Sequence, residues 1–351
     1  MDFSNGKSVT FERWLNSPSR FVGGRPIVVE GVPSDTVLFL RRGLVRVRDG
    51  MFAVGDESFP PVRVLGVVLA GTASMTGPAW SLAGEKGIPV ARVRRGRVVS
   101  VSVPFTGSVG VRLAQYEAVR GGSGLRLAVA FVGSCVRARA AFLRFLGLED
   151  AAVEVEGVLD GLEGVGSVGE LRGLEGRAAR VYFGALAEVL PGWAFSGRRT
   201  RRPPRSPFDS ALGLGYQLFL LPVLTGRAVA AGLDPFLGVL HVPREGRPSF
   251  VLDLMEEWRV LAVDVPVVRW FSDGVLDRSS FVRRGEGVFV RDARGVLRSL
   301  AGAVGALGAG VLRAVDRRLG EVRGALSGGS SLGVLGFDVG DVERVWEAAG
   351  G

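Results

Sequence analysis

The spacing of apolar residues changes near residue 104 of this 351-residue chain. Between residues 26 and 103 the apolar residues form short runs separated by turn-forming pairs such as Asp49-Gly50 and Arg95-Gly96. β-Branched residues bounded by such turns are typical of strands. This part predicts an antiparallel β domain, with strands expected over residues 27–29, 36–40, 44–47, 51–54, 62–69, 90–93 and 98–103.

One helix is expected to interrupt these strands, over residues 76–86. Ser74 or Thr76 is placed to cap its start, and Gly87 to end it. We expect this helix to cover an edge or a face of the sheets.

After Pro104 the apolar residues recur with helical spacing. In the segment 125–146, Leu127, Phe131, Cys135 and Phe142 fall mostly on one face. The predicted fold class is α+β, an N-terminal antiparallel β domain with one helix (34–106) and a mainly α-helical domain (107–351), preceded by an extension (1–33) without an assigned role. Helices are expected over residues 110–120, 125–146, 168–190, 208–231, 249–262, 297–326 and 339–348, and a small hairpin over 280–291.

The chain carries no segment that predicts membrane insertion or export. The apolar stretch 211–226 is broken by glycines, Gln217 and Pro222, and is shorter than the roughly 20 residues that span a bilayer. We expect a buried helix there. The single cysteine, Cys135, cannot form an intramolecular disulfide, which fits a cytoplasmic location.

The charge balance favours polyanionic partners. Lys and Arg number 44 against 35 Asp and Glu, a formal net charge of +9, and such an excess attracts nucleic acid or an anionic membrane surface. The segment 198–207 is rich in arginine and proline and is expected to be extended, which suits contact with a phosphate backbone. A solvated basic loop, or one whose arginines pair with acidic residues within a dimer, would explain the same residues. The five arginines of this segment are Arg198, Arg199, Arg201, Arg202 and Arg205.

The one histidine, His241, excludes every mechanism that needs two imidazoles. A predicted helix begins eight residues later and places Asp253 and Glu256 three apart, on one face. Their repulsion would be relieved by a divalent cation, and an imidazole from the preceding loop would complete a mixed shell that suits Mn²⁺ or Mg²⁺. Helical periodicity does not decide whether Glu256 or Glu257 is the second carboxylate. The same spacing also has a structural explanation, in which the helix dipole stabilises the acidic residues and the histidine makes ordinary hydrogen bonds.

Glu175 is a second candidate acidic residue. It precedes Gly176 and Ala178, small residues that would let another helix pack very close. The alternative is a solvated glutamate paired with Arg180.

Three segments, in order, carry a family resemblance: 174–182 (LEGRAARVY), 232–241 (GLDPFLGVLH) and 251–259 (VLDLMEEWR). Supporting matches lie at 87–97, 112–116 and 201–216, and the resemblance as a whole extends over nearly everything after about Ser34. On these residues the chain resembles the CRISPR-associated integrases that capture new spacers. It departs from the family pattern in having Ser134 and Arg137 in place of Lys and Asn, and Asp209 and Gly213 in place of Asn and Ser.

The resemblance implies a divalent-metal site, for Mg²⁺ or Mn²⁺, made by Glu175, His241 and Asp253, with Glu256 as a further acidic catalytic group. It implies that the helical domain, 107–351, is catalytic and that the β domain, 34–106, serves dimerisation and DNA contact. It also implies DNA contacts at the five arginines, at Tyr182 and at Arg259. The expected partners are DNA (a protospacer duplex and the CRISPR repeat), a second copy in a homodimer, and a small ferredoxin-like CRISPR-associated protein that bridges two dimers.

The predicted activity is that of a metal-dependent DNA endonuclease and integrase, which inserts short fragments into a CRISPR array by attack of a 3′-hydroxyl on a phosphodiester. Two alternatives stay open. A non-catalytic DNA-binding scaffold would bind duplex with a steep salt dependence but without dependence on divalent metal. A repair nuclease for branched DNA would show no preference for a repeat-bearing target.

Overall fold

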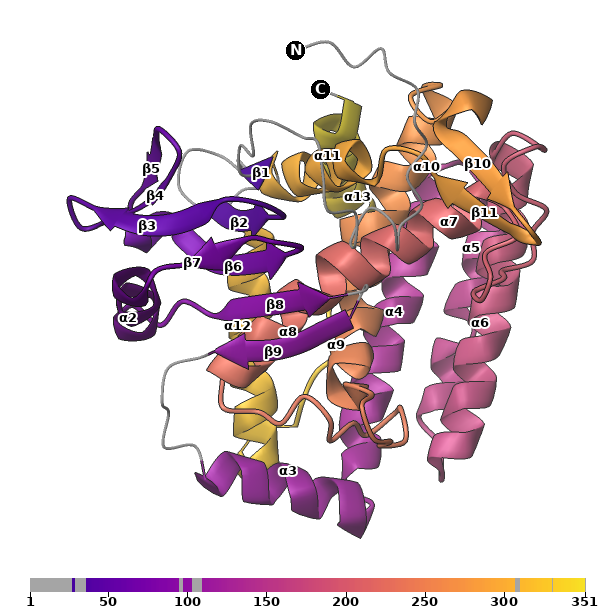
Figure 1. Cartoon of the computed structure of the whole chain (residues 1–351). Helices are drawn as coiled ribbons and strands as arrows, with labels where there is room; N and C mark the ends of the chain where they lie inside the picture. The colour runs from indigo at the N-terminus through magenta and orange to yellow at the C-terminus, as the bar shows by residue number, and fades with distance from the viewer. Residues whose placement is uncertain are drawn as a thin grey trace.

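The computed structural model describes residues 27–28, 36–94, 97–102, 109–306, 310–329 and 331–350. Within these residues the strand-rich part lies on one side of the molecule and the helices on the other (Figure 1). The last strand of the first part ends at Ser102 and the first helix of the second begins at Val109, where the sequence pattern changes. Most of residues 1–33, the predicted extension, lie outside the described residues.

The larger sheet has five strands in the order β1-β2-β6-β8-β9. Strand β6 is central and runs parallel to both β2 and β8, while β1 and β9 are antiparallel edges. The prediction of a purely antiparallel domain is therefore wrong. The strands are β1 (Ile27–Val28), β2 (Thr36–Leu40), β6 (Val64–Ala70), β8 (Val90–Arg94) and β9 (Arg97–Ser102).

The parallel pairs arise because whole elements are inserted between neighbouring strands. The chain between β2 and β6 builds most of a second sheet, of order β5-β4-β3-β7, and the chain between β6 and β8 supplies β7 and a helix. Such long connections return the chain in the same direction, whereas a hairpin reverses it. The second sheet consists of β3 (Leu44–Arg48), β4 (Met51–Val54), β5 (Glu57–Phe59) and β7 (Ser74–Met75).

Helix α2 (Gly77–Glu85) confirms the predicted helix. Thr76 accepts a hydrogen bond from the backbone N–H of Ala79, and Gly87, with φ of 71°, follows the last turn. The helix packs beside β3 and closes a small core that includes Leu38, Phe52 and Ala79.

The large sheet is buried on both faces, and alternate residues of β2 show it. Leu38 and Leu40 point into the small core, whereas Val37 and Phe39 join the large core of the helical part. Phe39 stacks on Phe219 with ring centroids 5.8 Å apart. The two parts therefore share one continuous hydrophobic interior.

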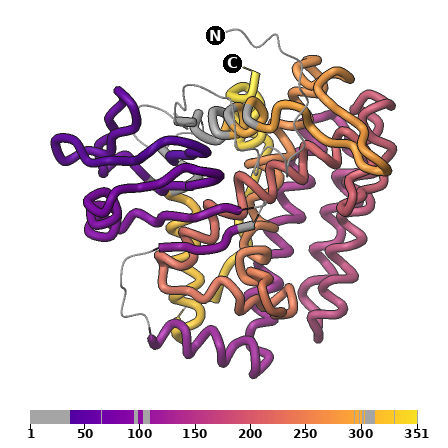
Figure 2. Tube along the Cα trace, in the orientation of Figure 1, coloured from indigo at the N-terminus to yellow at the C-terminus, as the bar shows by residue number. Residues whose placement is uncertain are grey.

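The helical part is built around α4 (Gly124–Phe145), which packs against α5, α6 and α9 (Figures 1 and 2). Helix α5 was not predicted, and the segment expected as one helix over 297–326 contains both α11 and α12. The helices are α3 (Val109–Gly121), α4, α5 (Glu149–Glu156), α6 (Val168–Val189), α7 (Pro207–Leu214), α8 (Leu221–Ala230), α9 (Ser249–Arg259), α10 (Val265–Ser272), α11 (Ala293–Ala306), α12 (Gly310–Leu326) and α13 (Val339–Gly350). The hairpin β10 (Phe281–Arg284) and β11 (Gly287–Val290) is confirmed.

Two long helices contain a π-helical turn. Gly215–Leu220 joins α7 to α8, and Val260–Asp264 joins α9 to α10. The first of these, Pro207–Ala230, is long and apolar enough to cross a membrane, but 72% of its most apolar window is buried inside the protein. This placement agrees with the predicted buried helix.

Candidate active site

The loop that carries His241 is held against two helices. From α3, the side-chain amide of Gln115 donates to the carbonyls of Asp234 and Leu237, at 2.9 and 3.0 Å, and accepts from the N–H of Asp234 at 2.8 Å. At Gly238 a Cβ would lie 2.7 Å from the carbonyl oxygen of His241. Only glycine allows this approach, so the loop reaches the start of α9 in one defined path.

Asp253, on the first turns of α9, fixes the end of this loop. Its Oδ2 accepts from the N–H groups of Val239 and Leu240, at 2.6 and 2.9 Å, and its Oδ1 from the N–H of His241 at 2.8 Å. The Nδ1 of His241 lies 2.7 Å from the same Oδ1. The buried carboxylate thus makes four hydrogen bonds, all to the loop.

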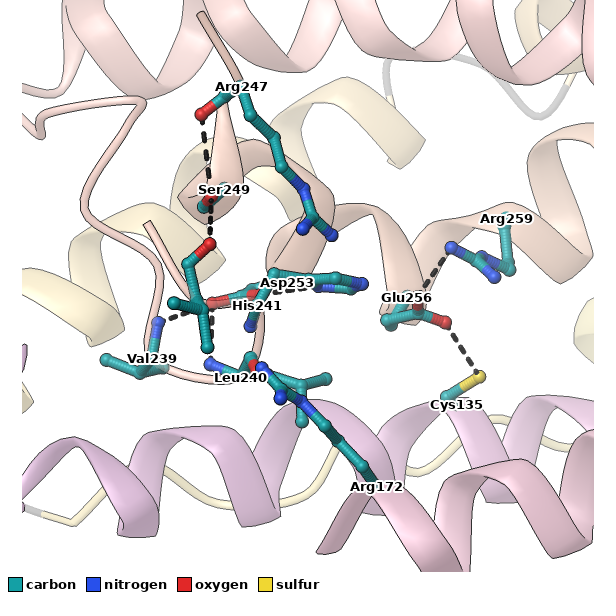
Figure 3. A network of polar contacts seen from close by, with 11 residues as sticks. Cys135, Arg172, Val239, Leu240, His241, Arg247, Ser249, Asp253, Glu256 and Arg259 are labelled. Atoms are coloured by element: carbon teal, nitrogen blue, oxygen red, sulfur yellow. Dashed lines mark hydrogen bonds and ion pairs between the residues drawn. The ribbon is translucent and has the colours of Figure 1, made fainter. Parts of the chain in front are cut away.

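This arrangement determines how His241 presents its ring. With Nδ1 bonded to Asp253, Nε2 is left as the nitrogen available to a ligand, the usual relation between a metal-binding histidine and an orienting carboxylate. The ring extends from Asp253 toward Glu256 (Figure 3). The structure thus brings His241 and Asp253 together, and in this arrangement Asp253 orients the histidine ring.

Glu256 and Glu257, which periodicity did not separate, have different surroundings. Oε1 of Glu256 accepts from the Arg259 guanidinium at 2.6 Å, and its Oε2 lies 3.8 Å from the Sγ of Cys135 (Figure 3). Glu257 faces α12 instead, where the Nε of Arg318 lies 3.1 Å from both of its oxygens. Glu256 is therefore the acidic residue on the His241 side, and Glu257 belongs to a structural ion pair.

Glu175, on α6, is held by α4. Its Oε1 accepts from the buried guanidinium of Arg139 at 2.9 Å. Burial works to raise the pKa of Glu175, but the positive charges of Arg139, Arg259 and Arg201 outweigh it, so the pKa is lowered. Gly176 has open space where a Cβ would stand, so no described helix packs close at this glycine, whereas Ala178 is fully buried.

The donor types of this region fit a hard divalent cation. Carboxylates of Glu175 and Glu256 with the Nε2 of His241 make the mixed oxygen and nitrogen set that Mg²⁺ and Mn²⁺ accept. Among the described residues, however, no three acidic, histidine or cysteine side chains stand close enough to share one ion. Both glutamates are bonded to arginines through one oxygen, and the three side chains would have to move closer together to share an ion.

Two residues expected to contact DNA lie inside the protein. Tyr182 is fully buried and donates its hydroxyl hydrogen bond to Asp264 at 2.9 Å. Arg259 is 8% exposed and is engaged by Glu256. In this arrangement Tyr182 has no surface for a nucleic acid and Arg259 has little, which corrects the expectation for Tyr182.

The five-arginine segment is exposed at four of its arginines and anchored at the fifth. Arg199 is only partly exposed, pairs with the buried Asp209, and lies over the ring of Phe183. Asp209 also accepts from the backbone and hydroxyl of Thr200. Aspartate in place of the family's usual asparagine thus gives Arg199 a charged partner and fixes the root of the segment. The exposed members are Arg198, Arg201, Arg202 and Arg205.

Sequence reasoning missed three arginines around His241. Arg172 donates to the carbonyl of Leu240, and Arg247 lies across the site from it (Figure 3). Burial lowers the pKa of Arg247, and the charges of Arg244, Arg172 and Arg201 lower it further. We name Arg172, Arg201, Arg244 and Arg247 the arginine rim. Isolated arginines on three separate segments leave no local pattern that sequence alone would reveal.

The reactivity of Cys135 tests whether the interior next to Glu256 is closed to solvent. Burial is the main reason that the pKa of its thiol is raised to about 12, and the residue is 0% exposed. At pH 8 we expect a thiol reagent such as 5,5′-dithiobis(2-nitrobenzoate) to react about 1,000-fold more slowly with native protein than with the chain unfolded in guanidinium, because thiolate is the reactive form. Because the chain has one cysteine, the absorbance reports this site alone. Equal rates would contradict the placement.

The fold and the site together define a class of protein. A strand-rich part shares its interior with a helical part, and the helical part presents one oriented histidine, acidic side chains and a rim of guanidinium groups. This set of groups is typical of proteins that carry out metal-dependent phosphodiester chemistry.

Residues 34–296 match the family model described as CRISPR associated protein Cas1. The chain is 48% identical over 327 residues to a CRISPR-associated endonuclease Cas1 of Methanopyrus kandleri, which covers 91% of this chain and 99% of that relative. It is 37% identical over 265 residues to one of Thermus thermophilus, covering 73% and 82%. The chain belongs to the Cas1 family, which confirms the resemblance found in its sequence.

Solved structures share the fold. A Cas1 protein from Thermotoga maritima superposes with a TM-score of 0.71 at 20% identity, over 85% of this chain and 99% of that one. A casposase bound to an integration product gives a TM-score of 0.70 at 20% identity, over 90% and 99%. These likenesses confirm the α+β class.

Proposed function

We propose that this protein is a metal-dependent DNA endonuclease and integrase of CRISPR adaptation, which joins a DNA 3′-hydroxyl to a phosphodiester. The supporting observation is the histidine held by Asp253, with its Nε2 turned away from that anchor toward Glu256. The relatives carry the name endonuclease, and a similar fold carries an integration product.

Glu175, His241 and Glu256 would hold the cation, with Asp253 fixing the histidine tautomer. Asp253 was predicted as a direct ligand, but its four hydrogen bonds to the loop favour the orienting role. When bound, Mg²⁺ or Mn²⁺ would supply Lewis-acid stabilisation of charge on the phosphate oxygens.

The remaining residues bind and orient. The lowered pKa of Glu175 keeps its carboxylate ionised near neutral pH, and the buried Arg139 offsets the repulsion between the acidic groups. The arginine rim would hold DNA phosphates beside His241, since guanidinium groups bind phosphate in a planar, bidentate geometry. No general base is assigned, because Nδ1 of the only histidine is engaged by Asp253.

The partners follow from the same relationships. Similar folds occur in a complex named Cas6-RT-Cas1–Cas2 and in a Cas1–DNA complex. We infer that this chain binds DNA and a Cas2-type protein, the small ferredoxin-like partner expected from the sequence, and that it acts as a homodimer in the cytoplasm.

The function is tested by joining a labelled short duplex with free 3′-hydroxyl ends to a supercoiled plasmid that carries the repeat. We expect product with Mn²⁺ or Mg²⁺ and none with EDTA. Duplex binding without joining under any metal, even with the small partner added, would support the scaffold alternative. Equal use of a generic branched DNA would support a repair nuclease.

Single substitutions in the rim should weaken DNA binding without sequence preference. Arg201→Ala and Arg247→Ala are each expected to reduce the slope of log K against log salt by about 1, the value for one phosphate contact. Fluorescence anisotropy across a salt series measures it. The matched control is Arg344→Ala, which removes an exposed arginine on α13 that pairs with Asp341, and it should leave the slope unchanged. Unchanged slopes for the rim variants would mean that the arginine rim does not contact DNA.

A further inference from the structure

Beneath the site, a buried chain of contacts connects Glu175 with Glu256. Arg139, which bonds to Glu175, lies over the ring of Tyr182 with its Cζ 5.6 Å from the centroid. Arg259, which bonds to Glu256, lies over the ring of Tyr216 at 5.3 Å. Each site carboxylate is thus held by a guanidinium that rests on a tyrosine.

The two tyrosines share one acceptor. Tyr182 donates to Oδ2 of Asp264 at 2.9 Å, and Tyr216 donates to Oδ1. Asp264 is 0% exposed and Tyr216 8%. The contacts therefore run from Glu175 through Arg139, Tyr182, Asp264, Tyr216 and Arg259 to Glu256, across four helical segments.

The backbone is adapted to bring Tyr216 and Asp264 together. Both lie in π-helical turns, which occur often at functional sites. At Gly215 a Cβ would stand 2.5 Å from Cγ1 of Val263. Only glycine permits such a close approach of the two turns. Because Gly215 and Val263 are in contact, the residues that follow them, Tyr216 and Asp264, also come within hydrogen-bond distance.

The two guanidinium groups have few other contacts among the described residues, although Arg139 also donates from Nη1 to the backbone carbonyl of Glu175 at 3.5 Å. The Nε atoms of Arg139 and Arg259 are buried without a hydrogen-bond partner in the described part of the chain. The plane of each guanidinium is therefore set by its carboxylate on one side and its tyrosine ring on the other. If the ring shifts, so does the carboxylate.

We propose that Asp264, with Tyr182 and Tyr216, is a positioning residue that sets the separation of Glu175 and Glu256 and so the metal affinity of the site. The inference rests on the proposed function. Asp264 touches neither the substrate nor the reacting atoms, and acts through the two tyrosine–arginine pairs.

The test measures Mn²⁺ binding by the electron paramagnetic resonance signal of free Mn²⁺, on Tyr182→Phe, Tyr216→Phe, the double variant and Asp264→Asn. We expect binding about 10- to 100-fold weaker, the usual loss when a partner of a metal ligand is removed, while duplex affinity stays at the wild-type value. In the joining assay, the Mn²⁺ requirement should rise, and saturating Mn²⁺ should restore most of the rate.

The chain supplies its own control, since it has three tyrosines and the third, Tyr116, is 49% exposed on α3. Tyr116→Phe should match the wild type. If Asp264→Asn does not fold, the tyrosine variants, which keep both rings, decide the question.

Three outcomes are distinguishable. Weakened Mn²⁺ binding in the buried variants but not in Tyr116→Phe supports the inference. A lower unfolding temperature with wild-type Mn²⁺ affinity would mean a merely structural role and would overturn it. Equal Mn²⁺ binding by wild type and His241→Ala would overturn the proposed function, and this inference with it.

Discussion

His241→Ala is expected to lower metal-dependent strand joining by about 1,000-fold, because several kcal/mol of lost transition-state stabilisation corresponds to about three decades of rate. DNA affinity should change little, since the arginine rim is intact and supplies the electrostatic attraction. Joining is measured with a labelled duplex and plasmid in Mn²⁺, and affinity by anisotropy with the same duplex.

Val242→Ala is the matched control, because Val242 is the next residue of the same loop and is 49% exposed. It should join DNA at the wild-type rate. A His241→Ala variant that still joins within tenfold of wild type would remove the histidine from the site. Loss of binding in proportion to joining would argue against the division between metal-binding residues and the arginine rim.

Arg318→Ala is expected to lower the free energy of unfolding by about 3–5 kcal/mol, the usual cost of removing one partner from a buried ion pair. Glu257 and Arg318 have side chains 0% and 2% exposed. Without the guanidinium, Glu257 keeps its charge in an apolar interior or takes up a proton. Burial already raises its pKa even with Arg318 present. Urea unfolding followed by circular dichroism gives the difference.

Two comparisons isolate the cause of that loss. Arg344→Ala breaks an exposed pair and should cost at most about 1 kcal/mol. Replacing both partners, as Glu257→Leu with Arg318→Met, should be far less destabilising than Arg318→Ala, because no buried charge is left unpaired; Glu321, the other partner of Arg318, is half exposed. If the double variant is the less stable one, the ion pair itself stabilises the fold.

Much of the helical part could be predicted from sequence because its pattern is local. In a helix such as α6, buried residues recur every three or four positions, and this spacing can be read within the segment itself. The sheet could not be predicted in the same way. The pairing of β2 with β6 depends on where the chain returns after building a second sheet, and no short segment records it.

The same difference between local and long-range information applies to the site. His241 and Asp253 lie close in sequence, so their spacing was enough to bring them together. The roles of Glu256 and Glu257 depend on whether Cys135 or Arg318 stands opposite, and these two partners come from distant helices. Tyr182 matched a family segment, but its burial against Asp264 is set by packing that a motif does not contain.

The position of Arg318 means that the family-model match and the folding unit have different limits. The match ends at residue 296, yet Arg318 of α12, which begins at Gly310, neutralises Glu257 on the helix that carries Asp253. A shortened protein ending at residue 296 would keep every proposed metal-binding residue but would lose the partner of this buried carboxylate. The segment after residue 296 is thus part of the unit that folds around the site, and lower activity in a chain trimmed there would reflect lost stability as well as lost chemistry.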